Sequence, residues 1–249
     1  MIDIHCHILP DLDDGSADMD ESLAMAHIAA NSGIEAIIAT PHFRGEEQSL
    51  TQLPKILSRY RHFARALSRT DIPITVYPGA EILCLPQTPR LARQKELPTL
   101  ADTNYLLVEF YFDESPEYMD GILRQIRDCG YRLVIAHPER YTAVQRNPAI
   151  ADRWNRLGYA LQLNKGSLLG AFGDRVQCTA TALLEDGVIR LIASDAHSIA
   201  RRTTDMRPLR QWLSRECPAE AAAILLEENP KRLLRGEELL PTGPVRLSL

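Results

Sequence analysis

The 249-residue sequence lacks the features that mark several classes of protein. No segment approaches eighteen consecutive apolar residues, and no basic N-terminal region precedes an apolar run, so neither a membrane span nor an export signal is expected. An excess of positive charge is also absent, because 28 lysines and arginines stand against 33 aspartates and glutamates, a net charge of −5. We therefore expect a cytoplasmic protein with no general affinity for nucleic acid or for anionic membranes.

The five cysteines lack the CxxC spacing of a zinc ribbon, and an odd, scattered set argues against a disulfide framework. One stretch, CLPQTPR at 84–90, does match the C-x5-R spacing of cysteine phosphatases. Such a loop cradles phosphate with consecutive backbone N–H groups, whereas Pro86 and Pro89 remove two donors here and no glycine is present. Cys84 is accordingly predicted to be an ordinary thiol.

Low-complexity linkers and sequence repeats are missing too, and short apolar runs alternate with longer amphipathic ones instead. Seven strands are predicted, at IDIHCH, IEAIIAT, ITVYPGAE, NYLLVEF, RLVIAH, YALQLN and VIRLIASDAH. Helices are predicted between them, at 16–33 with an Asp18/Glu21 capping signal, and at 50–69, 116–129, 148–157, 174–186 and 205–228, the last in two pieces. The alternation indicates an α/β fold with a parallel sheet, and residues 1–249 are predicted to form a single domain.

Ionisable side chains end six of the seven predicted strands. They are His5 and His7, His42, Glu81, Glu109, His137, and Asp195 with His197. A doubly wound sheet gathers ligands at one switch point, whereas a closed barrel brings every strand end onto one rim. The ring of side chains therefore favours a TIM-like barrel with its ligands at the C-terminal ends of the strands.

The first strand carries two histidines in alternation. His5 and His7 are predicted to point to the same side, while Cys6 points to the other side together with Ile2 and Ile4. Two imidazoles would then lie side by side at the strand end.

Histidine nitrogen and carboxylate oxygen form the ligand set of Zn, Mn or Fe. With Asp14 added from the DLDDG loop, the strand-end residues give nine candidate ligands, which would suit two or three ions sharing a bridging hydroxide and clamping a phosphate. Arg140, and either Arg201 or Arg202, would add guanidinium donors for phosphate oxygens. Asp11 and Asp13 are interpreted as solvated turn residues.

Eight motifs in order resemble those of the PHP (polymerase and histidinol phosphatase) superfamily: HCHILPDLDDG, ATPHF, PGAEI, LVEF, IAHPERY, LQLNKGSLLG, ASDAH and ENPKRLL. They are most similar to the branch of manganese-dependent bacterial protein-tyrosine phosphatases found with capsule and exopolysaccharide synthesis. The resemblance implies a distorted seven-stranded (β/α) barrel, the PHP fold, with a trinuclear metal site. His5, His7, Glu81 and Asp195 would gather round one ion, Glu109 and His137 round a second, and Asp14, His42 and His197 round a third.

The same resemblance implies hydrolysis of phosphotyrosine on a cytoplasmic tyrosine autokinase of polysaccharide export, without nucleic acid as a partner. Mn²⁺ is the expected metal, with Fe, Zn or Co as alternatives. Arg140 and Arg202 match positions that hold the phosphate, and His42 or His197 could assist as an acid. The alternatives are a phosphatase of a small metabolite such as histidinol phosphate, a nuclease-like phosphoesterase and, last, a binding module without turnover.

Two departures from the family pattern and one loop have structural consequences. Asp11 stands where glycine is usual, and Thr203 and Thr204 stand where prolines are expected after the paired arginines. The segment YFDESPEY at 111–118 is a candidate loop at the rim of the site, where its tyrosines could contact a peptide or simply pack.

Overall fold

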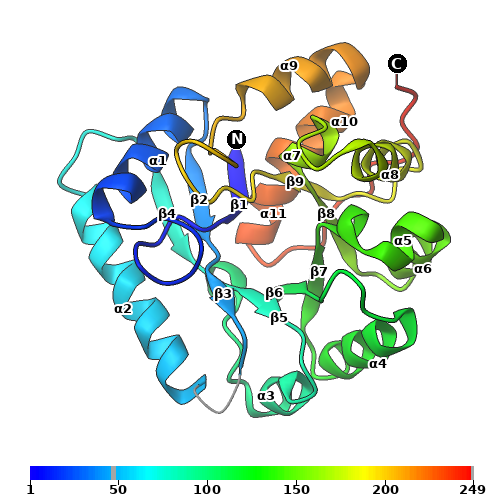
Figure 1. The fold of residues 1–249 in the computed structure, drawn as a ribbon, viewed down its shortest axis with the longest axis horizontal. Coiled ribbons are helices and arrows are strands. Elements are labelled where there is room, and N and C mark those ends of the chain that lie inside the picture. The colour runs from blue at the N-terminus through cyan, green and yellow to red at the C-terminus, as the bar shows by residue number, and fades with distance from the viewer. Residues whose placement is uncertain (46–48, 248–249) are drawn as a thin grey trace.

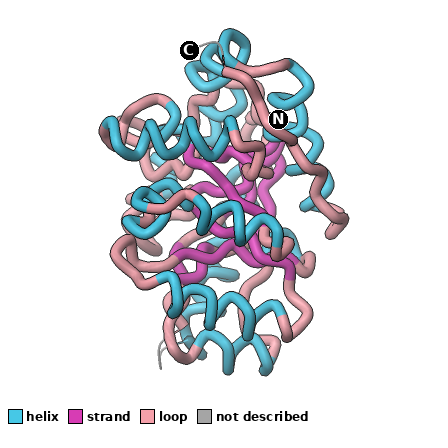
Figure 2. Tube along the Cα trace, turned by 90° about the vertical axis from the view of Figure 1, so that its right-hand side faces the viewer, coloured by secondary structure: helices cyan, strands magenta, loops and turns pink. Residues whose placement is uncertain are grey.

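A computed structural model describes residues 1–45 and 49–247, with parallel strands at the centre and helices around them (Figure 1, Figure 2). The strand segments are β1 (Ile2–Cys6), β2 (Ala36–Ala39), β3 (His42–Phe43), β4 (Thr75–Pro78), β5 (Glu81–Leu83), β6 (Tyr105–Glu109), β7 (Arg132–Ala136), β8 (Ala160–Asn164) and β9 (Leu191–Ala193). The helices are α1 (Met19–Asn31), α2 (Ser49–Leu67), α3 (Thr88–Gln94), α4 (Pro116–Arg127), α5 (Thr142–Arg146), α6 (Ala149–Arg156), α7 (Lys165–Leu168), α8 (Asp174–Glu185), α9 (Arg207–Glu216), α10 (Ala219–Ala223) and α11 (Asn229–Leu234).

The strands form two parallel sheets that together make a seven-position ring. One sheet has the order β1-β2-β4 and the other has the order β3-β5-β6-β7-β8-β9, and the chain passes from the first to the second at β2 to β3 and at β4 to β5. The ring closes between its first and last strands, where Asp195 N–H donates to His5 O and His7 N–H donates to Ala196 O, both at 2.9 Å. The prediction of a distorted seven-stranded (β/α) barrel is confirmed.

Two of the seven positions in the ring are each made of two short strand segments, β2 with β3 and β4 with β5. Pro41 separates β2 from β3, and Pro78 ends β4, because proline has no N–H to give to a strand ladder. Gly79 follows Pro78 at a point of close approach, where a Cβ would lie only 2.8 Å from Ile38 Cγ2. These breaks distort the barrel on the side of its first strands.

A β-bulge in β1 overturns part of the predicted alternation. Asp3 pairs with Ile37 and Cys6 pairs with Ala39, so β1 contains one more residue than β2 between these two pairs. The extra residue sends Ile4 into the inner apolar cluster and Cys6 into the outer one, so the prediction that these two share a face is wrong.

The predicted helices are present, and α1 begins as its sequence predicts. The Asp18 carboxylate accepts a hydrogen bond from Glu21 N–H at 2.9 Å, and the Glu21 carboxylate accepts one from Ala17 N–H at 2.9 Å. Three short helices, α3, α5 and α7, follow strand ends and were not predicted. No helix in the described part of the chain is long and apolar enough to cross a membrane.

Apolar side chains form two clusters that correspond to the two faces of the barrel wall. The outer cluster joins strands to helices and contains Met25, Phe63 and Trp154. The inner cluster fills the barrel and ends at Leu100 and Leu233, which pack against the first residues of the strands. The interior of the barrel is therefore closed by apolar contacts at its N-terminal end, and the ionisable side chains that end the strands lie at the C-terminal end.

Candidate metal centre

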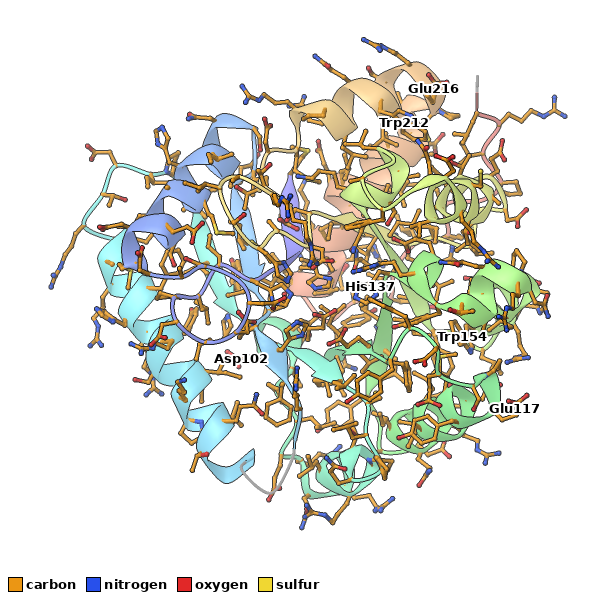
Figure 3. The ribbon with its side chains drawn as sticks, viewed as in Figure 1. Asp102, Glu117, His137, Trp154, Trp212 and Glu216 are labelled. Atoms are coloured by element: carbon orange, nitrogen blue, oxygen red, sulfur yellow. The ribbon has the colours of Figure 1, made fainter. Side chains whose placement is uncertain are left out.

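The ionisable side chains at the C-terminal strand ends converge on one pocket, with His137 near its centre (Figure 3). This cavity of about 260 Å³ is lined by Asp14, His42, Glu81, Glu109, His137, His197, Arg140 and Arg202, with Arg44, Phe110, Tyr111 and Phe112 beside them. The three other predicted ligands, His5, His7 and Asp195, are buried and contact the pocket residue Glu81 or His197. The fold thus brings all nine predicted ligands together.

The two histidines of the first strand face each other as predicted. Nδ1 of His5 lies 2.9 Å from Gln162 Oε1 and Nδ1 of His7 lies 2.8 Å from Asp13 Oδ2, so each neutral ring is assigned its proton on Nδ1. The two bare Nε2 atoms then stand 3.3 Å apart. Facing lone pairs repel unless a cation lies between them, which is the arrangement of two ligands of one metal ion.

Protons are drawn to this pair when no metal is bound. Burial lowers the pKa of His7, but the Asp13 and Glu81 carboxylates outweigh burial and raise it to about 9. A metal ion would therefore displace a proton from His7 as it binds.

Glu81 is the carboxylate around which the histidines are arranged. Its oxygens lie 2.8 Å from His137 Nε2, 3.2 Å from His42 Nδ1, 3.2 Å from His7 Nε2 and 3.3 Å from His5 Nε2. Burial by itself would raise the pKa of Glu81, but the surrounding imidazoles hold it well below its ordinary value. Glu81 is thus ionised and central, which suits a carboxylate shared between ions.

Three overlapping groups of donor atoms could each hold an ion. Within each group the donor atoms lie within 4.8 Å of one another, and the groups are His5, His7 and Glu81; His7, Asp14, His42 and His197; and His42, Glu81 and Glu109. His7, His42 and Glu81 each belong to two groups, so the groups overlap. A histidine nitrogen can bind only one ion, whereas the two oxygens of the Glu81 carboxylate could be shared between neighbouring ions.

The first two groups resemble sets expected from the family pattern, and the third differs in part. Glu109 was expected beside His137, but His42 Nδ1 lies 2.9 Å from Glu109 Oε1 whereas His137 Nε2 lies 3.8 Å from Glu109 Oε2. Asp195 adjoins the first group, with Oδ1 at 3.4 Å from His5 Nε2. This buried Oδ1 accepts no hydrogen bond from any described residue, as expected of an atom available to a cation.

Two arginines reach the pocket from different loops and meet at one carboxylate. Arg202 forms an ion pair with Asp195 Oδ2 and donates from Nε to Asp195 O at 3.1 Å, and Arg140 Nη1 lies 3.9 Å from the same Oδ2. Aromatic rings lie against both guanidinium groups. Arg140 Cζ is 4.2 Å from the ring centroid of Phe112 and 4.6 Å from the ring centroid of Phe172. Arg202 Cζ is 5.9 Å from the same Phe172 centroid.

The loop that carries Arg202 is fixed without the expected prolines. Arg202 has a φ of +49°, and its carbonyl accepts a hydrogen bond from His197 N–H at 2.8 Å. The carbonyl of Thr203 accepts one from the Lys165 ammonium, and the buried Thr204 donates from Oγ1 to a carbonyl of α1 at 2.7 Å. These bonds anchor the backbone where prolines would have stiffened it.

Arg201, the alternative to Arg202, lies in the adjoining turn. Its N–H donates to Ser198 Oγ at 3.0 Å, and its side chain is exposed outside the cavity. Of these two arginines, Arg202 is therefore the one whose position in the cavity fits a contact with phosphate.

The sequence analysis did not identify two amide side chains on β8, which corresponds to the one predicted strand without a candidate ligand. Gln162 Oε1 contacts His5 Nδ1, and Asn164 donates from Nδ2 to Asp195 Oδ2. Gln162 also donates from Nε2 to Asn164 Oδ1 at 2.9 Å, so the two side chains form one hydrogen-bonded pair that orients His5 and Asp195. Polar residues two apart in a fully buried strand were the signal in the sequence that could have identified them.

Asp13 is not the solvated turn residue that was predicted. Its side chain is 7% exposed, and its carboxylate accepts hydrogen bonds from His7 Nδ1 at 2.8 Å, His42 N–H at 2.9 Å and Gly15 N–H at 2.9 Å. The loop folds back so closely that a Cβ on Gly15 would lie 2.3 Å from His7 O, which carries Asp13 inward. Asp11 does stay exposed, and its φ of +53° explains why glycine is usual at that position.

Cys84 has the surroundings of an ordinary thiol. It is buried, and burial raises its pKa far above the ordinary value. The rest of the C-x5-R stretch leads into α3, where Arg90 is exposed and donates to Gln94. The segment therefore forms no anion-binding loop.

Known proteins match this chain over nearly its whole length. Residues 1–235 match the family model described as "Capsular polysaccharide synthesis, CpsB/CapC". Tyrosine-protein phosphatase YwqE of Bacillus subtilis is 36% identical over 99% of this chain and 97% of its own, and tyrosine-protein phosphatase CpsB of Streptococcus pneumoniae is 28% identical over 94% and 98%. A solved structure from a study of YwqE of Bacillus subtilis and CpsB of Streptococcus pneumoniae, described there as unique metal-dependent tyrosine phosphatases, matches 100% of both chains with a TM-score of 0.85 and 33% identity. The chain belongs to the CpsB/CapC family.

Proposed function

We propose that this protein is a metal-dependent phosphatase that hydrolyses phosphotyrosine in proteins. The observation that carries the proposal is the set of three overlapping donor groups beside Arg140 and Arg202 in one pocket. The similarity to YwqE and CpsB, both named tyrosine-protein phosphatases, supports the same function.

We assign two or three Mn²⁺ ions to the donor groups. Nitrogen and oxygen donors without a thiolate suit this metal and also accept Fe, Zn or Co. Bound ions would act as Lewis acids on the phosphate and lower the pKa of a water so that it can attack phosphorus at neutral pH.

The side chains around the donor groups would bind and orient the phosphate. Arg140 and Arg202 supply guanidinium N–H groups for its oxygens, while Asp195 and the two phenylalanine rings limit how far these arginines move. His42 is the most exposed of the five histidines at the centre, with its side chain 25% exposed. We assign it the proton that the leaving oxygen needs, which requires that one of its two ring nitrogens stays free of metal.

An aromatic edge beside the pocket favours a phosphotyrosyl substrate over a small polar metabolite. Tyr111 is 54% exposed and Phe112 is 42% exposed, both in the predicted rim loop and both lining the cavity. Exposed rings at the mouth of a phosphate pocket can stack against the phenyl ring of the substrate. The partner we propose is a tyrosine-phosphorylated autokinase of polysaccharide export, met in the cytoplasm.

The test is hydrolysis by purified protein that is stripped with chelator and reconstituted with Mn²⁺. We expect no turnover of a phosphotyrosyl peptide after stripping, recovery with Mn²⁺, and a much lower kcat/KM for histidinol phosphate. Preference for histidinol phosphate would show the substrate class to be wrong, and activity that persists without metal would refute the mechanism.

A further inference from the structure

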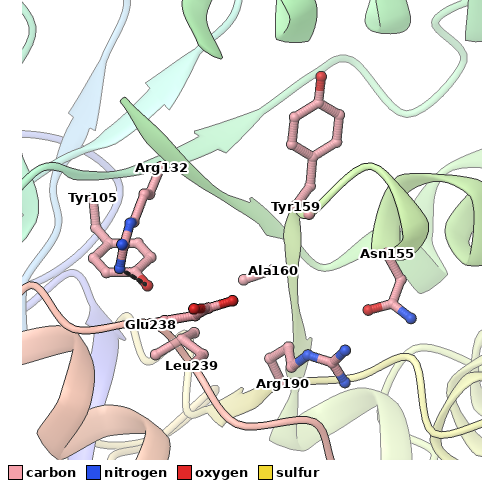
Figure 4. Close-up of a pocket in the computed structure, with 9 residues that line it drawn as sticks. Tyr105, Arg132, Asn155, Tyr159, Ala160, Arg190, Glu238 and Leu239 are labelled. Atoms are coloured by element: carbon pink, nitrogen blue, oxygen red, sulfur yellow. Dashed lines mark hydrogen bonds between the residues drawn. The ribbon is translucent and has the colours of Figure 1, made fainter. Parts of the chain in front are cut away.

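A second polar cavity lies at the opposite end of the barrel, where the strands begin (Figure 4). It has a volume of about 370 Å³, and its polar lining residues are Tyr105, Arg132, Asn155, Tyr159, Arg190 and Glu238. Tyr105 opens β6, Arg132 opens β7 and Arg190 immediately precedes β9. Since all the strands are parallel, this cavity faces away from the candidate metal centre and shares no lining residue with that pocket.

The two arginines of this cavity have N–H groups to spare. Arg190 donates from Nη1 to Gly187 O at 3.2 Å, and Arg132 donates from Nη1 to Tyr105 Oη at 3.4 Å and to Gly236 O at 3.2 Å. Neither forms an ion pair with a carboxylate of the described residues. A guanidinium carries five N–H donors, so both retain free donors in a fork that matches phosphate or carboxylate oxygens.

Arg190 is the less solvated of the two. Its side chain is half-buried, and burial lowers its pKa below the ordinary value. A partly desolvated cation without a counter-ion destabilises the protein, and an anion bound in the cavity would offset that cost.

Hydrogen-bond acceptors without donors lie in the same cavity. Oδ1 of Asn155 is buried and accepts no hydrogen bond from any described residue. The carboxylate of Glu238, in the segment that follows α11, forms no ion pair within the described part of the chain although two arginines line the same cavity. Both groups can accept hydrogen bonds from hydroxyl groups. A small anion that carries no hydroxyl groups has few donors to offer them.

We propose that this cavity binds a small anion that also carries several hydroxyl groups, of the chemical class of sugar phosphates. Arg132 and Arg190 bind the phosphate, Asn155 and Glu238 accept hydrogen bonds from the hydroxyls, and Tyr105 supplies a wall for the sugar ring (Figure 4). The site is separate from the phosphatase centre and does not depend on the function proposed for that centre.

Isothermal titration calorimetry of the metal-loaded protein with glucose 1-phosphate, inorganic phosphate and glucose tests the assignment. Because the metal centre can itself bind phosphate, the comparison counts only the binding that Arg190→Gln removes. For this part we expect saturable binding of glucose 1-phosphate that is at least about tenfold tighter than that of either fragment, because only the whole molecule satisfies both the arginines and the acceptors. Arg190→Gln should weaken this binding by about tenfold or more.

Two further variants make the result decisive. Arg140→Ala removes an arginine from the metal-centre pocket and should leave the binding of glucose 1-phosphate intact, which excludes that pocket as its site. Glu238→Gln changes an exposed side chain and should leave the fold intact. It weakens the acceptor for hydroxyl groups and removes a negative charge beside the anion, so phosphate should bind at least as tightly as before while glucose 1-phosphate loses much of its advantage over phosphate. Equal binding of phosphate and glucose 1-phosphate, no saturable binding, or binding insensitive to both Arg190→Gln and Glu238→Gln would overturn the proposal.

Discussion

The interior of the barrel is built by the same strands at both ends, but it is apolar where the strands begin and ionisable where they end. Strand β6 runs from Tyr105 through Leu107 in the inner apolar cluster to Glu109 in the metal-centre pocket, and the chain likewise runs from Leu191 in β9 to Asp195 beyond it. Burying ionisable groups costs free energy unless they are paired or bound to a cation, whereas burying apolar groups stabilises the fold. The N-terminal end should therefore determine stability and the C-terminal end activity, and substitutions at each end should separate the two properties.

The largest expected effect is at the centre of the C-terminal end. Glu81→Gln keeps the shape of the side chain but removes the charge that the four histidines surround. We expect kcat on a phosphotyrosyl peptide to fall by about 10³-fold, with lower bound metal, because metal-assisted catalysis depends on a shared carboxylate. Kinetics and elemental analysis of purified protein measure both quantities.

The control for Glu81→Gln is Glu35→Gln, which changes a carboxylate whose side chain is 79% exposed and remote from the pocket. Activity of Glu81→Gln within tenfold of the Glu35→Gln value would contradict a central role for Glu81.

The opposite end should respond in stability instead. Leu233 is fully buried in α11 against the first residues of the strands, and Leu233→Ala should lower the free energy of unfolding by about 2–5 kcal/mol. Urea unfolding measures the loss, and kcat of the folded protein should be unchanged. Leu234→Ala, at the partly buried neighbour, should cost clearly less, and equal losses would argue against a plug formed by Leu233.

The difference between the ends also decides what the sequence could predict. The barrel and eight of the nine candidate ligands followed from local signals, since six of the seven predicted strands end at a histidine or carboxylate. The hydrogen-bonded pair of Gln162 and Asn164 could not be predicted from the sequence. Neutral amides resemble ordinary strand residues, and their partners, His5 and Asp195, lie 157 and 31 residues away. The need for these amides arises only when the ring closes.

The DLDDG loop and β1 show a second limit of prediction. Asp11, Asp13 and Asp14 are chemically alike, and only the close return of the loop at Gly15 distinguishes the buried Asp13 from its exposed neighbours. The bulge in β1 likewise depends on pairing with β2, which periodicity within one strand does not report.

Within the C-terminal end, the adjacent arginines offer a matched pair. Arg202→Ala should lower kcat/KM for a phosphotyrosyl peptide by about 10²-fold, since it removes a donor aimed at the phosphate position. Arg201→Ala removes the same charge one residue earlier from an exposed turn and should leave kcat/KM within about twofold, as surface substitutions usually do. Equal effects of the two variants would mean that general positive charge, and not the geometry of Arg202, assists the reaction.

Asp13 should affect metal binding more than turnover. Asp13→Asn weakens the acceptor that fixes the proton of His7 on Nδ1, and we expect metal affinity to fall by about 10-fold to 100-fold. Saturating Mn²⁺ should then restore most of kcat. Metal titrations of activity separate the two parameters, and a loss of kcat that no metal concentration recovers would place Asp13 in the chemical step instead.

The smallest expected effect belongs to the thiol of Cys84. Cys84→Ala should leave kcat/KM for the phosphotyrosyl peptide unchanged within about twofold, because a neutral, buried thiol is not a nucleophile. The backbone N–H of Cys84, which donates to Glu109 O at 2.8 Å, is retained in the variant, so the strand that carries Glu109 should keep its position. Treatment with iodoacetamide should be equally without effect on activity, and inactivation that Cys84→Ala prevents would revive a cysteine mechanism. With Cys84 inert and Glu81 essential, catalysis would depend on the carboxylates and histidines at the strand ends.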